Sequence, residues 1–247
     1  MGLFSNIFSK NLEPIDFGIL HTDVHSHLIP GIDDGSKTME ETIAILQKFQ
    51  ELGYKKVITT PHIMSDYFNN NQEIIYDGLE KVRAEIAKTP QLTIELEAAA
   101  EYYTDTMFQE LIEKGEILTF GDNYVLFELS FQYEPANLKE VVFELSSAGY
   151  KPILAHVERY PYYINKWNKI EDYINRGVKL QLNINSLTGG YGKDIQKMAQ
   201  SLIEKDLIDL VGSDCHRFEH LMAMESLRKN KYVHQILNNP KLLNQSL

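Results

Sequence analysis

Short β-branched runs alternate with helical patterns along this 247-residue chain. The expected strands span residues 18–24, 55–60, 92–98, 124–129, 151–155, 179–183 and 207–212. The expected helices span residues 38–52, 72–88, 105–114, 137–148, 169–176, 194–204 and 219–230. Strands that are each followed by a helix predict a mostly parallel sheet with right-handed crossovers. Such a sheet either closes into a seven-stranded barrel or stays open as a doubly wound sheet.

The polar residues at the strand ends favour the barrel. Six of the expected strands carry or run into metal-ligand residue types, which are His25 and His27, His62, Glu101, Glu128, His156, and Asp214 with His216. Side chains alternate along a strand, so His25 and His27 point to the same face. A lone histidine at a strand end is usually structural, but five of the eight histidines lie in this position. Such residues converge only if the strand ends share one rim, as they do at the C-terminal face of a barrel.

Composition excludes several classes of protein. A balance of 24 basic and 35 acidic residues gives a net charge of -11, which argues against nucleic acid or an anionic membrane as the main partner. No run approaches the roughly 20 apolar residues of a membrane-spanning helix. The single cysteine, Cys215, is expected to be buried and fits a reducing compartment. We therefore expect a cytoplasmic protein with one domain over residues 1–247.

The N-terminus carries an apolar stripe. Leu3, Phe4, Ile7 and Phe8 fall at helical spacing and predict a short amphipathic helix. Its apolar side either packs on the domain or makes a weak contact with a membrane or a partner.

The donor types also limit the metal. Imidazole and carboxylate without thiolate suit manganese, iron, cobalt or zinc better than calcium or a structural zinc site. Nine candidate ligands, including an aspartate of the Asp33-Asp34 turn, are enough for two or three ions with shared carboxylates. Such a cluster generates hydroxide near neutral pH and holds a phosphoryl group during transfer.

Other phosphate chemistries are excluded by specific positions. A cysteine-based phosphatase loop would need arginine six residues after Cys215, where the chain has Leu221. The glycine-rich run 187–193 lacks the first glycine of a P-loop and is followed by Asp194 in place of serine or threonine. We expect this run to be a turn before a helix.

The segment 23–35, DVHSHLIPGIDDG, resembles the opening motif of the polymerase and histidinol phosphatase (PHP) superfamily. Within it, the chain resembles the CpsB/CapC family of manganese-dependent bacterial protein tyrosine phosphatases. The other motifs follow in order over residues 20–227, and they are TPH at 60–62, Glu101, Phe127-Glu128, HVERY at 156–160 and SDCH at 213–216. The resemblance implies a distorted (β/α)7 TIM-like barrel, the PHP fold, with three metal ions.

The resemblance also implies roles for single residues. His25, His27, Glu101 and Asp214 would hold one ion, with Glu101 bridging; Glu128 and His156 would complete the second, and Asp34, His62 and His216 would hold the third. Asp33 is the alternative to Asp34. Asp23 lies on the strand face of the two histidines and would support the ligands.

Arg159 is the expected phosphate-binding residue, because a guanidinium matches phosphate oxygens with two parallel hydrogen bonds. Its alternative is an exposed salt bridge. The second arginine of the family is not matched at its usual place, where Arg217 or His220 would substitute, and His220 is a candidate proton donor. Tyr102, Tyr103, Tyr160, Tyr162 and Tyr163 either flank a substrate ring or pack internally.

The leading hypothesis is metal-dependent hydrolysis of phosphotyrosine in a protein, which would be a bacterial tyrosine kinase of capsule or exopolysaccharide synthesis. Only the resemblance supplies the tyrosine and the kinase. The alternatives are a small-molecule phosphatase of histidinol-phosphate type and a catalytically silent metal-binding regulatory module. The residues alone predict neither the native metal nor the oligomeric state. The resemblance favours manganese.

Overall fold

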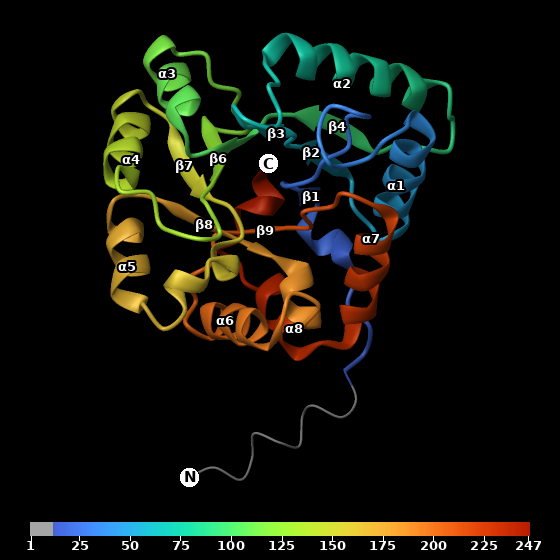
Figure 1. Cartoon of the computed structure of the whole chain (residues 1–247). Coiled ribbons are helices and arrows are strands. Elements are labelled where there is room, and N and C mark those ends of the chain that lie inside the picture. Colours follow the sequence, from blue (N-terminus) through green and yellow to red (C-terminus); the bar gives the residue numbers. More distant parts are fainter. Residues whose placement is uncertain (1–11) are drawn as a thin grey trace.

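The computed structural model describes residues 12–247, so the predicted N-terminal helix lies outside the described residues. Its strands form two parallel sheets, of three and six strands, that together curl into a ring (Figure 1). They are β1 (Thr22–Asp23), β2 (Lys56–Thr59), β3 (His62–Ile63), β4 (Glu95–Ala98), β5 (Glu101–Tyr103), β6 (Tyr124–Glu128), β7 (Lys151–Leu154), β8 (Lys179–Asn183) and β9 (Leu210–Gly212). The orders β1-β2-β4 and β3-β5-β6-β7-β8-β9 follow the chain around the ring.

Seven of the nine segments fall within the predicted strands, whereas β3 and β5 lie beyond the predicted ends at residues 60 and 98 and continue the second and third strands after an interruption. The second strand breaks into β2 and β3 around Pro61, which has no N–H for the ladder. The third breaks into β4 and β5 at Ala99-Ala100. The ladder continues through both breaks, because Glu101 N donates to the Pro61 carbonyl at 3.1 Å. This irregularity is the distortion that the resemblance implies.

The last strand returns to the first and closes the barrel. Beyond β1 and β9, Ser26 and Cys215 form a parallel bridge, and Asp214 N donates to the His25 carbonyl at 2.8 Å. At the opposite end of the two strands, the buried Asn244 side chain donates to the Thr22 and Val211 carbonyls and accepts from Val211 N. The predicted α/β barrel is therefore confirmed.

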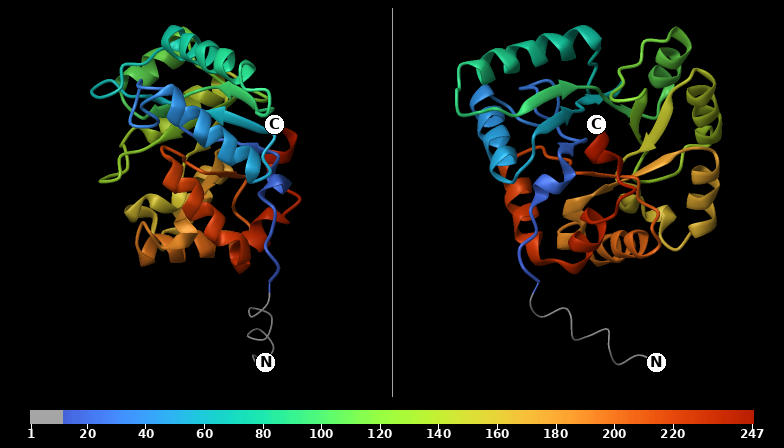
Figure 2. Two further views of the ribbon diagram at one scale, coloured as in Figure 1. Left: turned by 90° about the vertical axis from the view of Figure 1, so that its right-hand side faces the viewer. Right: turned by 180° about the vertical axis from the view of Figure 1, so that it is seen from behind.

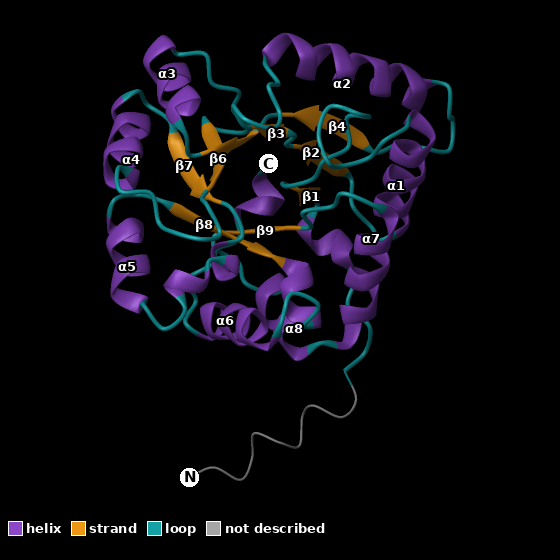
Figure 3. Ribbon diagram, in the orientation of Figure 1, coloured by secondary structure: helices purple, strands orange, loops and turns teal. Residues whose placement is uncertain are grey.

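The helices surround the strands (Figure 3). They are α1 (Met39–Glu51), α2 (Gln72–Ala87), α3 (Thr106–Lys114), α4 (Leu138–Ser147), α5 (Trp167–Asn175), α6 (Lys193–Glu204), α7 (Phe218–Glu225) and α8 (Lys231–Leu237). Local sequence explains their ends. Thr38 caps α1 by accepting from Glu41 N at 3.3 Å, and Gly53 follows the helix with a φ of 102°.

Two sequence predictions are wrong in detail. Residues 18–20 are not a strand but part of a 3-10 turn (Phe17–Leu20), because the Asp16 carboxylate accepts from Gly18 N and holds the chain in a turn. The predicted helix 219–230 ends at Glu225 and is followed by a short turn and then by α8, which the sequence analysis did not predict. The Asn230 side chain starts this additional helix by accepting from Tyr232 N at 2.8 Å.

The buried apolar residues form two cores, one larger and one smaller. The larger core lies between the strands and the helices. The smaller core includes Val24, Ile58, Leu126, Ile153 and Leu210, against which Leu243 and Leu247 of the C-terminal turn pack. The C-terminus accordingly lies in the middle of the ring in both the front and the back view (Figures 1 and 2). The predicted polar ligands lie at the other end of the barrel.

Among residues 12–247, no helix combines the length and apolar character that crossing a membrane requires.

Candidate metal centre

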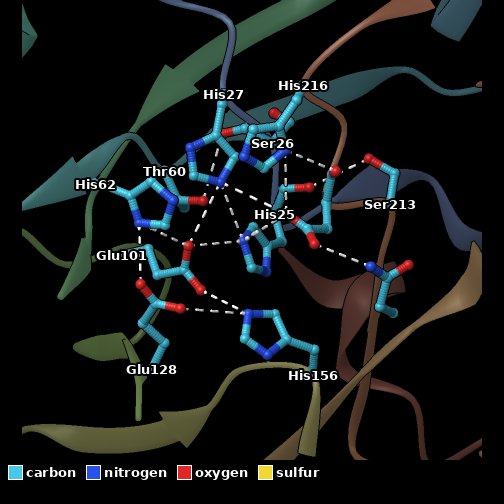
Figure 4. A network of polar contacts seen from close by, with 12 residues as sticks. His25, Ser26, His27, Thr60, His62, Glu101, Glu128, His156, Ser213 and His216 are labelled. Atoms are coloured by element: carbon cyan, nitrogen blue, oxygen red, sulfur yellow. Dashed lines mark hydrogen bonds and ion pairs between the residues drawn. The ribbon is translucent and has the colours of Figure 1, made fainter. Parts of the chain in front are cut away.

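The nine predicted ligands lie in one connected cluster at the C-terminal ends of the strands. Figure 4 shows the imidazoles around the Glu101 and Glu128 carboxylates. Three groups of potential donors fall close enough together to share an ion, namely His25, His27 and Glu101; His62, Glu101 and Glu128; and His27, Asp34, His62 and His216. The structure thus brings together residues that are almost 200 positions apart, while their role as ligands remains a prediction.

The first group is the most deeply buried. His25 Nε2 lies 3.1 Å from Glu101 Oε2, and His27 Nε2 lies 3.4 Å from the same oxygen. Asp214 Oδ1 is 3.4 Å from His25 Nε2 and 3.6 Å from His27 Nε2. His25, His27 and Glu101 lie mutually close enough to share one ion, and Asp214 contacts the two histidines without being part of that group, so its place on the first ion stays a prediction.

The second group shares the Glu101 carboxylate. His62 Nδ1 lies 3.3 Å from Glu101 Oε2 and 3.2 Å from Glu128 Oε1. His156 Nε2 lies 3.0 Å from Glu101 Oε1 and 3.9 Å from Glu128 Oε2. Glu101 therefore stands between two sets of imidazoles, which is where a bridging carboxylate belongs.

The third group depends on Asp34 rather than Asp33. Asp34 Oδ1 lies 3.2 Å from His216 Nε2 and 3.6 Å from His62 Nε2. Asp33 points elsewhere, because its Oδ2 accepts from His27 Nδ1 at 2.8 Å and from His62 N at 3.1 Å, and its Oδ1 accepts from Gly35 N at 2.9 Å. Of the two aspartates left open by the sequence, Asp34 faces the cluster and Asp33 orients His27.

A second layer of hydrogen bonds sets the direction of the rings. Gln181 Oε1 lies 3.1 Å from His25 Nδ1 and also accepts from His156 N at 2.8 Å. The Asn183 amide donates to Asp214 Oδ2 at 2.9 Å. With their Nδ1 atoms occupied, His25 and His27 direct Nε2 into the cluster, the arrangement that typical metal-binding histidines have. Neither amide was predicted from the sequence, although Gln181 and Asn183 are two positions apart on one strand and therefore point to the same face as each other.

Opposite charges perturb the pKa values of the cluster. Burial alone would lower the pKa of His25, but Glu101 and Asp214 outweigh it and raise this pKa to about 9. Burial also opposes the charged form of His62, yet Glu101 and Glu128 raise its pKa to about 10. Against burial, the neighbouring cations His25, His216 and Arg159 hold the pKa of Asp214 below its usual range. Protons therefore balance the carboxylates here, and a divalent cation would displace them.

The buried atoms fit metal ions better than they fit one another. Glu101 Oε2 and His156 Nδ1 have no well-formed hydrogen bond within the described chain, although both are buried. His25 Nε2 and His27 Nε2 face each other at 3.3 Å. Buried polar atoms without partners are rare and costly, whereas imidazole and carboxylate donors around one point suit a cation. The residues present therefore fit two or three divalent ions.

Two of the six described non-glycine residues with positive φ belong to the cluster. His156 and Asp214 have φ values of 32° and 50°, in the left-handed region that non-glycine residues seldom adopt. Strain of this kind persists where the surroundings hold it, and it clusters at functional sites.

Arg159 lies beside the cluster and not on the open surface. Its Nη1 donates to Asp214 Oδ2 at 2.6 Å, and its guanidinium lies 4.5 Å from the Tyr191 ring centre and 5.0 Å from that of Phe131. With its side chain only 22% exposed, Arg159 is not the exposed salt bridge considered as its alternative. The glycine-rich turn that supplies Tyr191 thus lies over the site, a contact that the sequence analysis did not predict.

The remaining predicted residues lie at a greater distance from the chemistry. His220 Nδ1 lies 3.1 Å from the Asp214 carbonyl, and neither His220 nor the exposed Arg217 lines the cavity in the described structure. Asp23 accepts from Ser213 N and Oγ, at 2.8 and 3.0 Å, and so holds the strand that carries Asp214. Cys215 is buried, as predicted.

The predicted tyrosines divide between packing and the cavity. Tyr102, Tyr160 and Tyr163 are fully buried and belong to the core. Tyr103 lines the cavity.

The cluster forms the floor of an open cavity of about 480 Å³. This volume lies within the range of small-molecule sites. Seven of the nine predicted ligands line the cavity, all except the buried His25 and His27. Besides these and Arg159, its wall consists of Met64, Tyr67, Phe68, Tyr103, Ser130, Phe131 and Gln132. A charged floor below a partly aromatic wall is suited to a ligand with an anionic end and an apolar body.

A model of the family described as "Capsular polysaccharide synthesis, CpsB/CapC" matches residues 21–238. The chain belongs to the CpsB/CapC family. This confirms the resemblance seen in the sequence. The tyrosine-protein phosphatase CpsB of Streptococcus pneumoniae is 30% identical over 203 residues, which cover 80% of this chain and 83% of that protein. The tyrosine-protein phosphatase YwqE of Bacillus subtilis is 23% identical over 230 residues, 90% of each chain.

Solved structures agree with the fold of this CpsB/CapC member. A structure from a study of YwqE from Bacillus subtilis and CpsB from Streptococcus pneumoniae, called unique metal-dependent tyrosine phosphatases, has a TM-score of 0.77 at 22% identity and covers 91% of this chain and 94% of the other. The lactonase Lmo2620 from Listeria monocytogenes has a TM-score of 0.53 at 13% identity, covering 92% and 88%. The barrel is thus shared with proteins of other activities, and the site must carry the functional argument.

Proposed function

We propose that this protein is a metal-dependent phosphatase that hydrolyses phosphotyrosine in a protein, and that its substrate is a tyrosine kinase of capsule or exopolysaccharide synthesis. One observation carries the proposal: five imidazoles and four carboxylates form one connected cluster, seven of whose members line an open cavity together with Arg159, while His25 and His27 lie buried beneath it. The names of the relatives support phosphotyrosine as the substrate. The family description supports the link to capsule synthesis.

The charges of the site favour an anionic substrate once ions are bound. Asp34, Glu101, Glu128 and Asp214 are four carboxylates, which two divalent cations would neutralise. A third cation, together with Arg159, would make the floor positive and attract a phosphate dianion. Manganese is the favoured metal, with iron, cobalt or zinc as alternatives. Ions held by these ligands would activate water and neutralise charge on the phosphoryl oxygens.

The residues of the chain contribute positioning. The guanidinium of Arg159 contacts the rings of Phe131 and Tyr191 and donates to Asp214, so it is held in place before a ligand arrives. Its remaining N–H groups are available for phosphate oxygens, which it would stabilise as negative charge builds up. Asp33, Gln181 and Asn183 hold the ligands from behind.

The proposal is tested by comparing substrates and variants with manganese added. The wild type should turn over a phosphotyrosine peptide in preference to histidinol phosphate, and a phosphorylated capsule tyrosine kinase in preference to an unrelated phosphotyrosine protein. His25→Ala and Asp214→Ala should abolish turnover because each removes a predicted ligand. A preference for histidinol phosphate, or metal binding without hydrolysis of any aryl phosphate, would overturn the proposal in favour of the small-molecule enzyme or the silent module.

Arg159 has a separate test. Arg159→Ala should keep the metal content of the wild type and lose about 10- to 100-fold in kcat/KM, since a hydrogen bond to a charged group is worth about 1.5–3 kcal/mol. Arg176→Ala is the matched control, because Arg176 is exposed on the protein surface and pairs with Asp172. Unchanged turnover in Arg159→Ala would refute its phosphate-binding role.

A further inference from the structure

Two aromatic rings of the cavity wall stack against imidazoles of the cluster. The Phe68 ring is stacked on His62, with centroids 5.5 Å apart and planes 12° apart. The Phe131 ring is stacked on His156 at 5.7 Å and 29°. His62 and His156 approach different oxygens of Glu101, and Figure 4 shows them on either side of its carboxylate. The two phenylalanines therefore rise from opposite sides of the cavity floor.

We propose that Phe68 and Phe131 are the two walls of a slot that receives the aromatic ring of an aryl phosphate, and that they make the site select aryl over alkyl phosphate esters. The proposal rests on the proposed function in one respect, since it places the phosphoryl group on the floor formed by the predicted ligands. The ester oxygen then lies between the rings, and the group attached to it occupies the space between Phe68 and Phe131.

The Phe68 wall is preorganised. Met64 and Phe68 exchange two backbone hydrogen bonds of 3.0 and 2.9 Å, which close a tight loop. The buried Asn70 side chain donates to the His62 carbonyl at 2.8 Å and to the Ile32 carbonyl at 3.0 Å. The loop is thus tied to the strand end that carries His62. A ring held in place before binding saves the cost of ordering it afterwards.

The Phe131 wall is anchored from below and open above. Its ring lies 5.6 Å from that of the buried Tyr160, whose hydroxyl accepts from Leu129 N at 3.0 Å. The Ser130 carbonyl accepts from the Tyr162 hydroxyl at 2.8 Å. Even so, Phe131 remains 42% exposed. The Arg159 guanidinium also lies over this ring, so the exposed part of Phe131 lines the cavity next to the expected phosphate-binding group and can contact a ligand ring there.

Selectivity follows from what each ester can cover. An aryl ester would cover the parts of both phenylalanine rings that line the cavity, whereas a small alkyl ester leaves them in water. Stacking of aromatic pairs is worth about 2- to 10-fold in affinity beyond buried area. Phenols also leave more readily than alcohols because of their lower pKa. Binding of non-hydrolysable phosphonates separates the slot from this leaving-group effect.

The experiment measures phenylphosphonate and methylphosphonate binding to the manganese-loaded full chain by calorimetry. Phe68→Leu should weaken phenylphosphonate about 2- to 10-fold and leave methylphosphonate unchanged. Phe131→Leu should weaken phenylphosphonate at least as much and also weaken methylphosphonate, because Phe131 supports Arg159. Tyr191 also contacts the Arg159 guanidinium, so Tyr191→Leu should weaken both ligands equally. Phe143→Leu on α4, where the ring is 70% exposed, is the control and should change neither.

The two possible failures are distinguishable. If the Phe68→Leu and Phe131→Leu proteins keep the wild-type melting temperature and metal content, and still bind both phosphonates with the wild-type affinity ratio, the slot is refuted while the phosphatase proposal stands. If the wild type binds neither phosphonate, the phosphoryl-binding floor is refuted and the slot falls with it. A parallel fall in kcat/KM for a phosphotyrosine peptide, but not for the phosphoserine peptide of the same sequence, would support the slot.

Discussion

Replacing Asp33 by asparagine should weaken metal binding, although Asp33 does not face the cluster and acts through the predicted ligand His27. The Asp33 carboxylate is buried and accepts three hydrogen bonds, from His27 Nδ1, His62 N and Gly35 N. Asparagine has the same shape but only one accepting oxygen. If that oxygen faces His27 and His62, the amide group faces the Gly35 N–H, donor against donor. The opposite orientation sacrifices the two other bonds.

The magnitude follows from the charge of the carboxylate. Burial alone would raise the pKa of Asp33, but His27 and the Gly35 N–H outweigh it and lower this pKa from 3.8 to about 2. Because the folded-state pKa is depressed, the ionised carboxylate stabilises the fold above the unfolded pKa and loses this contribution as the pH falls toward 2. The drop of this pKa from 3.8 to about 2 corresponds to ~2 kcal/mol, at about 1.4 kcal/mol per pKa unit. Loss of such a supporting partner costs about 10- to 100-fold in metal affinity.

Two measurements test this reasoning. Urea unfolding of the chelator-treated Asp33→Asn protein at pH 7 should give an unfolding free energy ~2 kcal/mol below that of the wild type. Manganese titration should give a Kd about 10- to 100-fold higher. Asp66→Asn removes the charge of an exposed aspartate in the loop after β3 and should change neither quantity. A manganese affinity for Asp33→Asn within twofold of the wild type would refute the role assigned to Asp33.

Three further predictions concern pH, metal removal and the barrel floor. In chelator-treated protein, the pKa values of His25 and His62 are raised to about 9 and 10, so their protonated rings stabilise the fold fully below the histidine pKa of the unfolded chain. This contribution is lost as the pH rises through the folded-state values, and the unfolding free energy from urea titrations should therefore fall between pH 7 and 10. Over the same range manganese affinity, measured by calorimetry, should rise because binding releases those protons; a flat profile would contradict the protonated cluster. Removing manganese should lower the melting temperature, since ions at 100 times their Kd add about 2.7 kcal/mol per site to the stability of the folded state. Equal melting curves with and without chelator would refute the prediction that the metal binds the folded chain in preference to the unfolded chain. Asn244→Ala leaves buried backbone groups of Thr22 and Val211 without partners and should cost about 1–3 kcal/mol in urea unfolding, whereas an unchanged midpoint would show that the side chain does not hold the barrel closed.

Much of the fold could be predicted because the local signals agree with the topology. Strand β8 was predicted at its observed bounds, Lys179–Asn183, and the first helix was predicted over residues 38–52 and observed as Met39–Glu51. The failures lie where a side chain overrides a β-branched run, as Asp16 does at Gly18, or where a local cap starts a new helix, as Asn230 does. Such effects depend on a single hydrogen bond, which periodicity does not detect.

The sequence by itself determined which donors are available and that they gather at one rim, because parallel strands in a barrel must place their carboxyl ends together. It did not determine which atom each residue presents. That Asp34 faces the cluster while Asp33 holds His27, that Gln181 and Asn183 orient the ligands, and that Tyr191 lies against Arg159 are decisions of the tertiary structure. The physical reason is that these contacts depend on turn geometry and on side chains meeting across strands far apart in the chain, and a linear pattern contains no distances between them.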